Sequence, residues 1–81
     1  MDENSILARI DRLVDEEHQL RSAVQRGALT SDEERVRLRS IEEELDQCWD
    51  LLRRRRAARD NSQDPDAVDP RPVPEVESYL Q

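Results

Sequence analysis

The sequence predicts an all-α protein: an antiparallel, coiled-coil-like hairpin of two helices, followed by an acidic tail. Apolar residues recur at spacings of three, four and seven over residues 6–24 and 38–52, which is the pattern of one buried helical face. Helix-breaking residues are scarce, because Gly27 is the only glycine and all four prolines lie near the C-terminal end. This scarcity argues against a β-sandwich or barrel, which needs turn residues every few positions. Trp49 and Tyr79 are the only aromatic residues, which excludes a phenylalanine-rich globular core.

The first helix is predicted from about Ser5 to Arg26. Its seam consists of five apolar positions, Ile6, Ile10, Leu13, Leu20 and Val24. Asp2, Asn4 and Ser5 are residue types that accept hydrogen bonds from the free amides of a first helical turn. Gly27 follows the last seam position, where a residue in the left-handed conformation commonly ends a helix.

The second helix is predicted from about Ser31 to Arg59. A threonine or serine followed three residues later by glutamate forms a capping box, and Thr30 with Glu33, or Ser31 with Glu34, offers that spacing. The seam of this helix contains Leu38, Ile41, Leu45, Cys48 and Leu52. Two long helices of similar amphipathic pattern therefore follow each other along the chain.

The predicted hairpin covers residues 1–59, with a turn at 27–30 that is short enough to impose an antiparallel arrangement. Its apolar stripe is wider at the end far from the turn. The residues that widen it are Leu7, Val14, Trp49 and Leu51. Two helices cannot bury this stripe against each other. A second copy in a four-helix bundle, the chain's own tail or a different protein is expected to cover it.

Residues 60–81 form a tail with a net charge of −5, compared with −2 for the hairpin. Asp, Asn, Ser, Gln and Pro dominate residues 60–74, which is the composition of a disordered or extended linker. Residues 74–81 fit a short terminal helix that docks on an apolar surface, and a frayed end is the alternative. The apolar positions of that helix are Val76, Tyr79 and Leu80.

The net charge of −7 argues against a nucleic-acid-binding protein, because it repels phosphate. One basic cluster is present, made of Arg53, Arg54, Arg55, Arg56 and Arg59. Consecutive helical residues point in different directions, so the arginines surround the helix and do not form one surface that could contact the bases of a nucleic acid. Two interpretations stay open: binding of RNA or the ribosome, and pairing with the acidic tail and the helix dipole.

Few residues are candidates for catalysis or metal binding. Asp15 and His18 have the carboxylate-x-x-His spacing of metal-binding helix bundles, a weak match that any acidic helix with a histidine can produce. Glu17 interrupts the first seam and is expected to pair with Arg21 or with an arginine across the hairpin. Cys48 occupies a seam position that suits a small buried apolar residue. We therefore expect no enzyme activity, no cofactor, no metal and no small-molecule substrate.

Four segments of the sequence resemble a known family: Ile6–Ile10, Leu13–Arg21, Leu45–Arg53 and Val76–Gln81. The chain is similar along nearly its whole length to small actinobacterial proteins of domain-of-unknown-function family 2630. The resemblance implies a bacterial cytosolic helical protein and brings no activity, cofactor or site.

Together these features predict a small, non-enzymatic interaction or adaptor protein of the cytoplasm, acting as a homodimer or on a protein partner. No stretch approaches the ~20 apolar residues of a membrane span, so no membrane association is expected. The expected interface consists of Leu7, Val14, Trp49, Leu51, Val76, Tyr79 and Leu80. One alternative is a nucleic-acid- or ribosome-associated factor that uses the basic cluster. A second alternative is a metal-binding helical-bundle enzyme built on Asp15 and His18.

Overall fold

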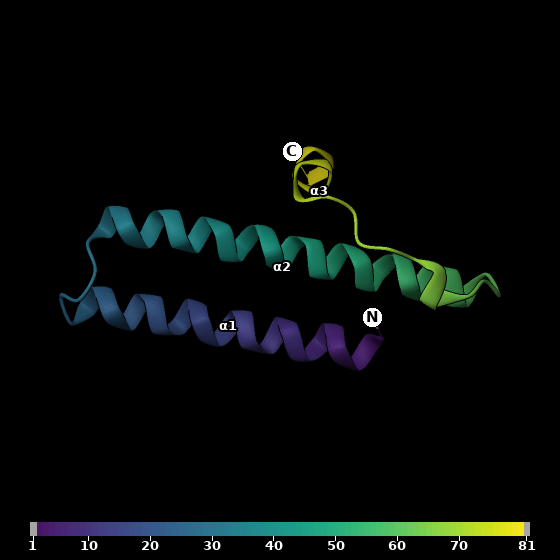
Figure 1. The fold of residues 1–81 in the computed structure, drawn as a ribbon, viewed down its shortest axis with the longest axis horizontal. Helices are drawn as coiled ribbons and strands as arrows, with labels where there is room; N and C mark the ends of the chain where they lie inside the picture. Colours follow the sequence, from purple (N-terminus) through teal and green to yellow (C-terminus); the bar gives the residue numbers. More distant parts are fainter. Residues whose placement is uncertain (1, 81) are drawn as a thin grey trace.

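The computed structural model describes residues 2–80, and the side chains of residues 2–78. It contains α1 (Glu3–Gln25), α2 (Ser31–Asp60), a 3-10 turn η1 (Pro65–Ala67) and α3 (Val73–Leu80), and this described part contains no strand. α1 and α2 lie side by side and antiparallel, and together they form a rod (Figure 1). The extents are 51 × 26 × 14 Å. The predicted all-α hairpin is confirmed.

Local hydrogen bonds fix both ends of α1. The Asp2 carboxylate accepts a hydrogen bond at 2.7 Å from the amide three residues later, so α1 begins two residues before the expected start. At the other end, the Gly27 amide donates to the Val24 carbonyl at 3.0 Å and the Ala28 amide donates to the Ala23 carbonyl at 2.8 Å. This pair of bonds is a Schellman motif, and Gly27 has the φ of 75° that the motif requires.

The ends of α2 are fixed in the same way. The Thr30 hydroxyl accepts from the Glu33 amide at 3.1 Å, and the Glu33 carboxylate accepts from the Thr30 amide at 3.4 Å, which confirms the first of the two candidate capping boxes. The C-terminal end is a second Schellman motif centred on Ser62, whose φ is 57°. The amides of Ser62 and of the next residue donate to the carbonyls of Arg59 and Ala58 at 3.1 and 2.7 Å.

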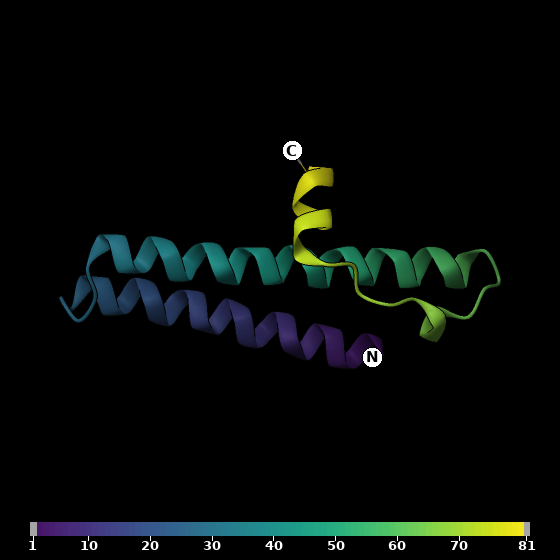
Figure 2. The same ribbon diagram turned by 45° about the horizontal axis from the view of Figure 1, so that its top comes forward.

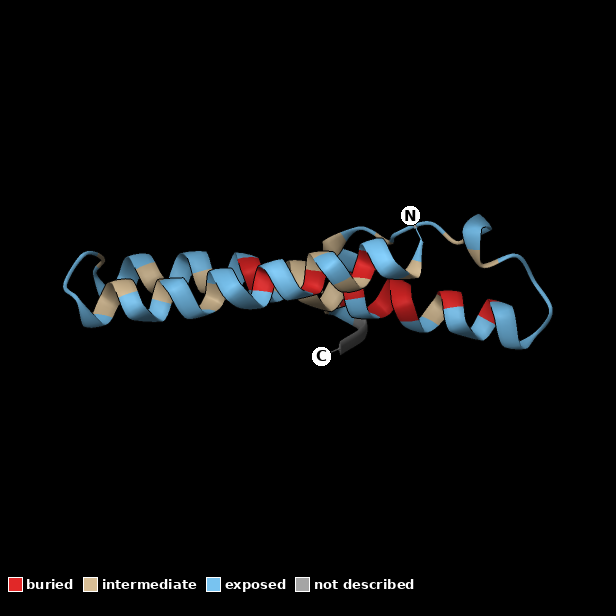
Figure 3. Ribbon diagram, turned by 90° about the horizontal axis from the view of Figure 1, so that it is seen from below, coloured by how far each residue is buried: buried red, intermediate tan, exposed pale blue. Residues whose placement is uncertain are grey.

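Most of the buried core lies in the half of the hairpin far from the turn (Figure 3). Its members are Ile6, Ile10, Leu13, Ile41, Cys48, Leu51 and Leu52. Toward the turn the seam is only half-buried, and Glu17 occupies the position where burial declines. The Glu17 carboxylate pairs with Arg21 at 3.1 Å within α1 and is 23% exposed. The expected ion pair is present, and most of the apolar stabilisation comes from the turn-distal half.

The tail returns along α2 instead of leaving the hairpin (Figure 2). After Ser62 it passes through η1, continues without regular secondary structure over residues 68–72 and enters α3. α3 crosses α2 on the side opposite α1 (Figure 1). Its Val76 is completely buried. The linker over residues 60–74, expected to be disordered or extended, is a mostly irregular segment with a definite path. Its ion pairs with α2, described next, account for the difference.

Candidate interaction surface

Asp50 anchors the tail to α2. Its side chain is 3% exposed, and its carboxylate accepts hydrogen bonds from Arg54 Nε at 3.0 Å and from Arg71 Nε at 3.1 Å. The Arg71 guanidinium donates a further short bond to the same carboxylate. These hydrogen bonds hold the pKa of Asp50 below its ordinary value, and those from Arg71 have the largest effect. Gln47 adds a hydrogen bond to the Arg71 carbonyl at 2.9 Å, so both the side chain and the backbone of Arg71 are fixed.

Arg55 holds an earlier part of the tail. Its side chain is 8% exposed and donates to the Pro65 carbonyl and to the Asp66 carboxylate, both at 2.9 Å. Arg54 donates to the Asp69 carbonyl at 2.6 Å. We call these contacts the tail latch, with Asp50, Arg54, Arg55, Asp66 and Arg71 as its charged members. Because Asp50 and Arg55 are buried, removal of either partner would leave a charge without compensation.

The basic cluster is not an open cationic surface. Arg54 and Arg55 belong to the tail latch, and Arg56 pairs with Glu3 at 2.9 Å. Arg53 and Arg59 are exposed. Pairing with the acidic tail, one of the two interpretations of this cluster, is observed at Arg55. A phosphate group would have to compete with three internal partners to use the whole cluster.

Residues 48–51 point in four different directions around α2. Cys48 is 5% exposed and belongs to the core, Asp50 is 2% exposed under the tail, and Leu51 is 4% exposed. Trp49, which lies between two of them in sequence, is 42% exposed. Since successive residues are rotated by about 100°, Trp49 lies on a face of α2 that neither α1 nor the tail covers.

Val14 lies on the same edge of the hairpin as Trp49. The Glu3–Arg56 ion pair marks this edge, because it joins the two helices. Val14 lies three whole turns from Glu3 along α1, and Trp49 lies two whole turns from Arg56 along α2. Each therefore lies on the same side of its helix as the ion-paired residue, and the two are about 6 Å apart along the hairpin axis. The half-buried Leu7 and Leu45 flank them. We call these four apolar residues the Trp49 strip: Leu7, Val14, Leu45 and Trp49.

The structure separates the predicted interface residues into two groups. Leu51 and Val76 are buried within the chain, at 4% and 0% exposure. The tail therefore covers part of the wide stripe, which was one of three expected possibilities. Trp49 and Val14 remain 42% and 38% exposed. The other two predicted interface residues of the tail, Tyr79 and Leu80, have side chains that lie outside the described part of the chain.

The candidates for chemistry are not brought together. Asp15 and His18 are both exposed on α1. Within the part of the chain that the structure describes, no group of three or more His, Cys, Asp or Glu residues could hold a metal ion. Cys48 is free and buried, and burial raises the pKa of its thiol. The thiol therefore stays protonated at neutral pH, which suits the expected apolar role.

The contact between α3 and α2 includes two acidic side chains. Glu77 of α3 lies against Asp46 of α2, and this proximity raises the pKa of Glu77. One carboxylate oxygen of Glu77 is buried and has no hydrogen-bond partner among the described residues. The charged form of Glu77 thus opposes the docking of α3, and the protonated form does not.

Sequence reasoning missed Asp50 and Arg71, the two residues that fix the tail most firmly. Two signals were available. Arg71 is the only basic residue in the acidic tail, and Asp50 stands between Trp49 and Leu51 in an apolar segment. A single basic residue in an acidic tail and a single acidic residue in an apolar segment are candidates for an ion pair, here across 21 positions of sequence.

No helix in the described residues combines the length and apolar character that crossing a membrane takes. A family model described as "Protein of unknown function (DUF2630)" matches residues 2–81. Uncharacterised proteins of Mycobacterium bovis and of Mycobacterium tuberculosis strains CDC 1551 and H37Rv are 48% identical to the chain over 77 residues, which covers 95% of the chain and 88% of each relative. No solved structure matches the chain. The chain belongs to the DUF2630 family.

Proposed function

We propose that this DUF2630 protein is a small, non-enzymatic cytosolic protein that binds another protein through the Trp49 strip. The exposure of Trp49 supports the proposal most directly. The chain's own tail reaches the next residue, Asp50, and buries it to 2% exposure, yet Trp49 stays 42% exposed. The tail that packs on α2 therefore does not cover the whole apolar stripe.

Tryptophan is the residue type most often found to dominate the binding energy of a protein interface. Val14, Leu7 and Leu45 extend the apolar surface around it, so Trp49 is not an isolated apolar side chain of the kind that is common on protein surfaces. The Glu3–Arg56 pair borders the strip at one end. An apolar centre with a charged margin is the usual composition of an interface.

A second copy of the chain is the first partner to test. Sedimentation equilibrium over a wide range of protein concentrations should show association of the full-length chain, and the double variant Val14→Gln/Trp49→Gln should not associate. Val36→Gln is the matched control, because Val36 is a single valine on α2 that is 72% exposed outside the strip. Trp49 fluorescence reports the same event, since burial of the only tryptophan shifts its emission to shorter wavelength.

If the full-length chain stays monomeric, a different protein is the expected partner. Full-length chain and both variants would then be used to capture proteins from a mycobacterial lysate under identical conditions. The proposal expects a protein that the full-length chain and Val36→Gln retain and that Val14→Gln/Trp49→Gln loses. Equal retention by all three chains, with no self-association, would overturn the proposed role of the strip.

A further inference from the structure

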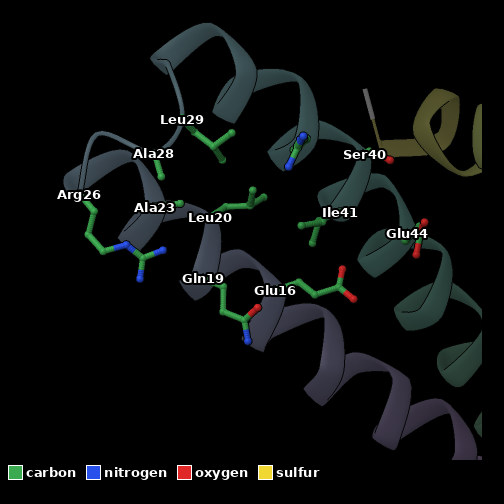
Figure 4. Close-up of a pocket in the computed structure, with 11 residues that line it drawn as sticks. Glu16, Gln19, Leu20, Ala23, Arg26, Ala28, Leu29, Ser40, Ile41 and Glu44 are labelled. Carbon is green, nitrogen blue, oxygen red and sulfur yellow. The ribbon is translucent and has the colours of Figure 1, made fainter.

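A groove lies between α1, α2 and the turn, at the end of the hairpin away from the Trp49 strip (Figure 4). Its volume is about 650 Å³, which is within the range of small-molecule sites. Leu20 of α1, Leu29 of the turn and Ile41 of α2 line its interior, each from a different segment. Leu20 and Leu29 are only half-buried, so the groove exposes apolar surface to water.

The groove exists because short side chains stand where a longer one would fill it. Ala23, Ala28 and Ser40 all line it, from α1, the turn and α2 respectively. The Schellman motif fixes Ala28, since its amide is bonded to the Ala23 carbonyl at 2.8 Å. The same hydrogen bonds that end α1 therefore also shape one wall of the groove.

The charges around the groove favour an anion. Arg26 and Arg37 line it, and neither makes an ion pair with any residue whose side chain the structure describes. Of the two acidic residues that line it, Glu44 is paired with Arg9 at 3.5 Å. When Arg9 is counted together with its partner Glu44, the charged residues at the groove sum to +1, a small excess of positive charge.

We propose that this groove binds a small amphipathic carboxylate. The apolar part of the ligand would lie on Leu20, Leu29 and Ile41, and its carboxylate would pair with Arg37 or Arg26 at the rim. The site is separate from the Trp49 strip, because Glu44 of the groove is rotated about 140° around α2 from Trp49. Loss of one site therefore does not imply loss of the other.

The test uses three probes with the same apolar chain: octanoate, octanol and octylammonium. Each is titrated into the isotopically labelled full-length chain while amide resonances are followed by NMR. Octanoate is expected to shift the amides of Leu20, Ala28 and Ile41, and to bind about two- to fivefold more tightly than octanol, the effect of one exposed ion pair. Octylammonium is expected to bind most weakly.

Two double variants decide the role of the arginines. Arg26→Gln/Arg37→Gln should bind octanoate no better than octanol, whereas Arg12→Gln/Arg35→Gln, which removes two exposed arginines elsewhere, should keep the preference. Ala23→Leu fills the groove and should abolish binding of all three probes while leaving the hairpin folded. The proposal is overturned if octanoate shifts no groove amide, if octylammonium binds as tightly as octanoate, or if the two double variants behave alike.

Discussion

The tail latch makes a quantitative prediction about the pair Asp50 and Arg71. Their coupling can be measured with the variants Asp50→Asn, Arg71→Gln and the combination of both. An exposed ion pair is worth about 0.2–1 kcal/mol, and breaking a fully buried pair costs about 3–5 kcal/mol. Asp50 is 3% exposed and Arg71 is 29% exposed, so this pair lies between those limits. We expect a coupling free energy of about 1–2 kcal/mol, a factor of about 5 to 30 in the docking equilibrium.

Hydrogen exchange of the α3 amides measures this coupling, because the tail can leave α2 while the hairpin stays folded. Each single variant should accelerate exchange at Val76, and the double variant should add little to either. Exchange at Ile10 in the core should change much less. Arg53→Gln is the matched control, since Arg53 is exposed on the same helix and has no place in the tail latch.

Additive effects of the two single variants, with a coupling below about 0.3 kcal/mol, would refute the reasoning, because independent sites add within that limit. The same conclusion would follow if Arg53→Gln released α3 as effectively as Arg71→Gln. Arg54 also donates to Asp50, so Arg54→Gln should have a smaller effect of the same sign.

Three further predictions concern the helix ends and the acidic pairs. Gly27→Ala should lower the free energy of unfolding by about 1 kcal/mol in urea, because alanine is strained at a φ of 75° although its methyl group meets nothing within 4 Å; an unchanged urea midpoint would count against this. Ser62→Gly should raise it by about 0.5–1 kcal/mol, because glycine adopts a φ of 57° without strain; a lower midpoint would show that the serine is not strained. The docking of α3 should be tightest in mild acid. The pKa of Glu77 is raised by Asp46, so docking strengthens as pH falls through that raised value. The pKa of Asp50 is lowered by Arg71, so its contribution is full above the ordinary aspartate pKa of 3.8 and is lost as pH falls through the lowered value. Glu77→Gln should remove the gain in α3 protection that appears as the pH is lowered from neutral toward the ordinary glutamate pKa of 4.5. Hydrogen exchange of α3, corrected for its intrinsic pH dependence, measures this gain, and a wild-type profile without it would contradict the prediction.

The hairpin could be predicted from the sequence because its signals are local. The conformation at Gly27 and the capping box of Thr30 with Glu33 each depend on residues within a few positions of one another. The seam spacing of three and four residues is equally local. Each of these features agrees with the same fold, which is why the elements and the turn were found.

The path of the tail could not be predicted in the same way. The contacts of Asp50 with Arg71 and of Arg55 with Asp66 join residues 21 and 11 positions apart and have no periodic pattern. Composition alone indicated a disordered or extended linker over residues 60–74. Long-range ion pairs override that tendency here, because they neutralise two charges that α2 buries.

The Trp49 strip was predicted only in part, again because the position of the tail depends on long-range contacts. Periodicity places Leu51 and Trp49 in one wide stripe, but it does not say which side the tail will cover. The tail buries Leu51 and leaves Trp49 open. The groove near the turn went unpredicted because it results from short side chains, Ala23 and Ala28, that meet only in three dimensions.

The tail docks on one face of α2 and leaves Trp49 open on another. Acrylamide quenching of Trp49 fluorescence, in dilute full-length chain and in Asp50→Asn, tests this claim most directly. If the tail lies where the structure places it, its release changes the quenching constant of Trp49 little, and quenching is already substantial in the full-length chain. A strong rise in quenching when the tail is released would show that the tail covers Trp49 and would contradict the account.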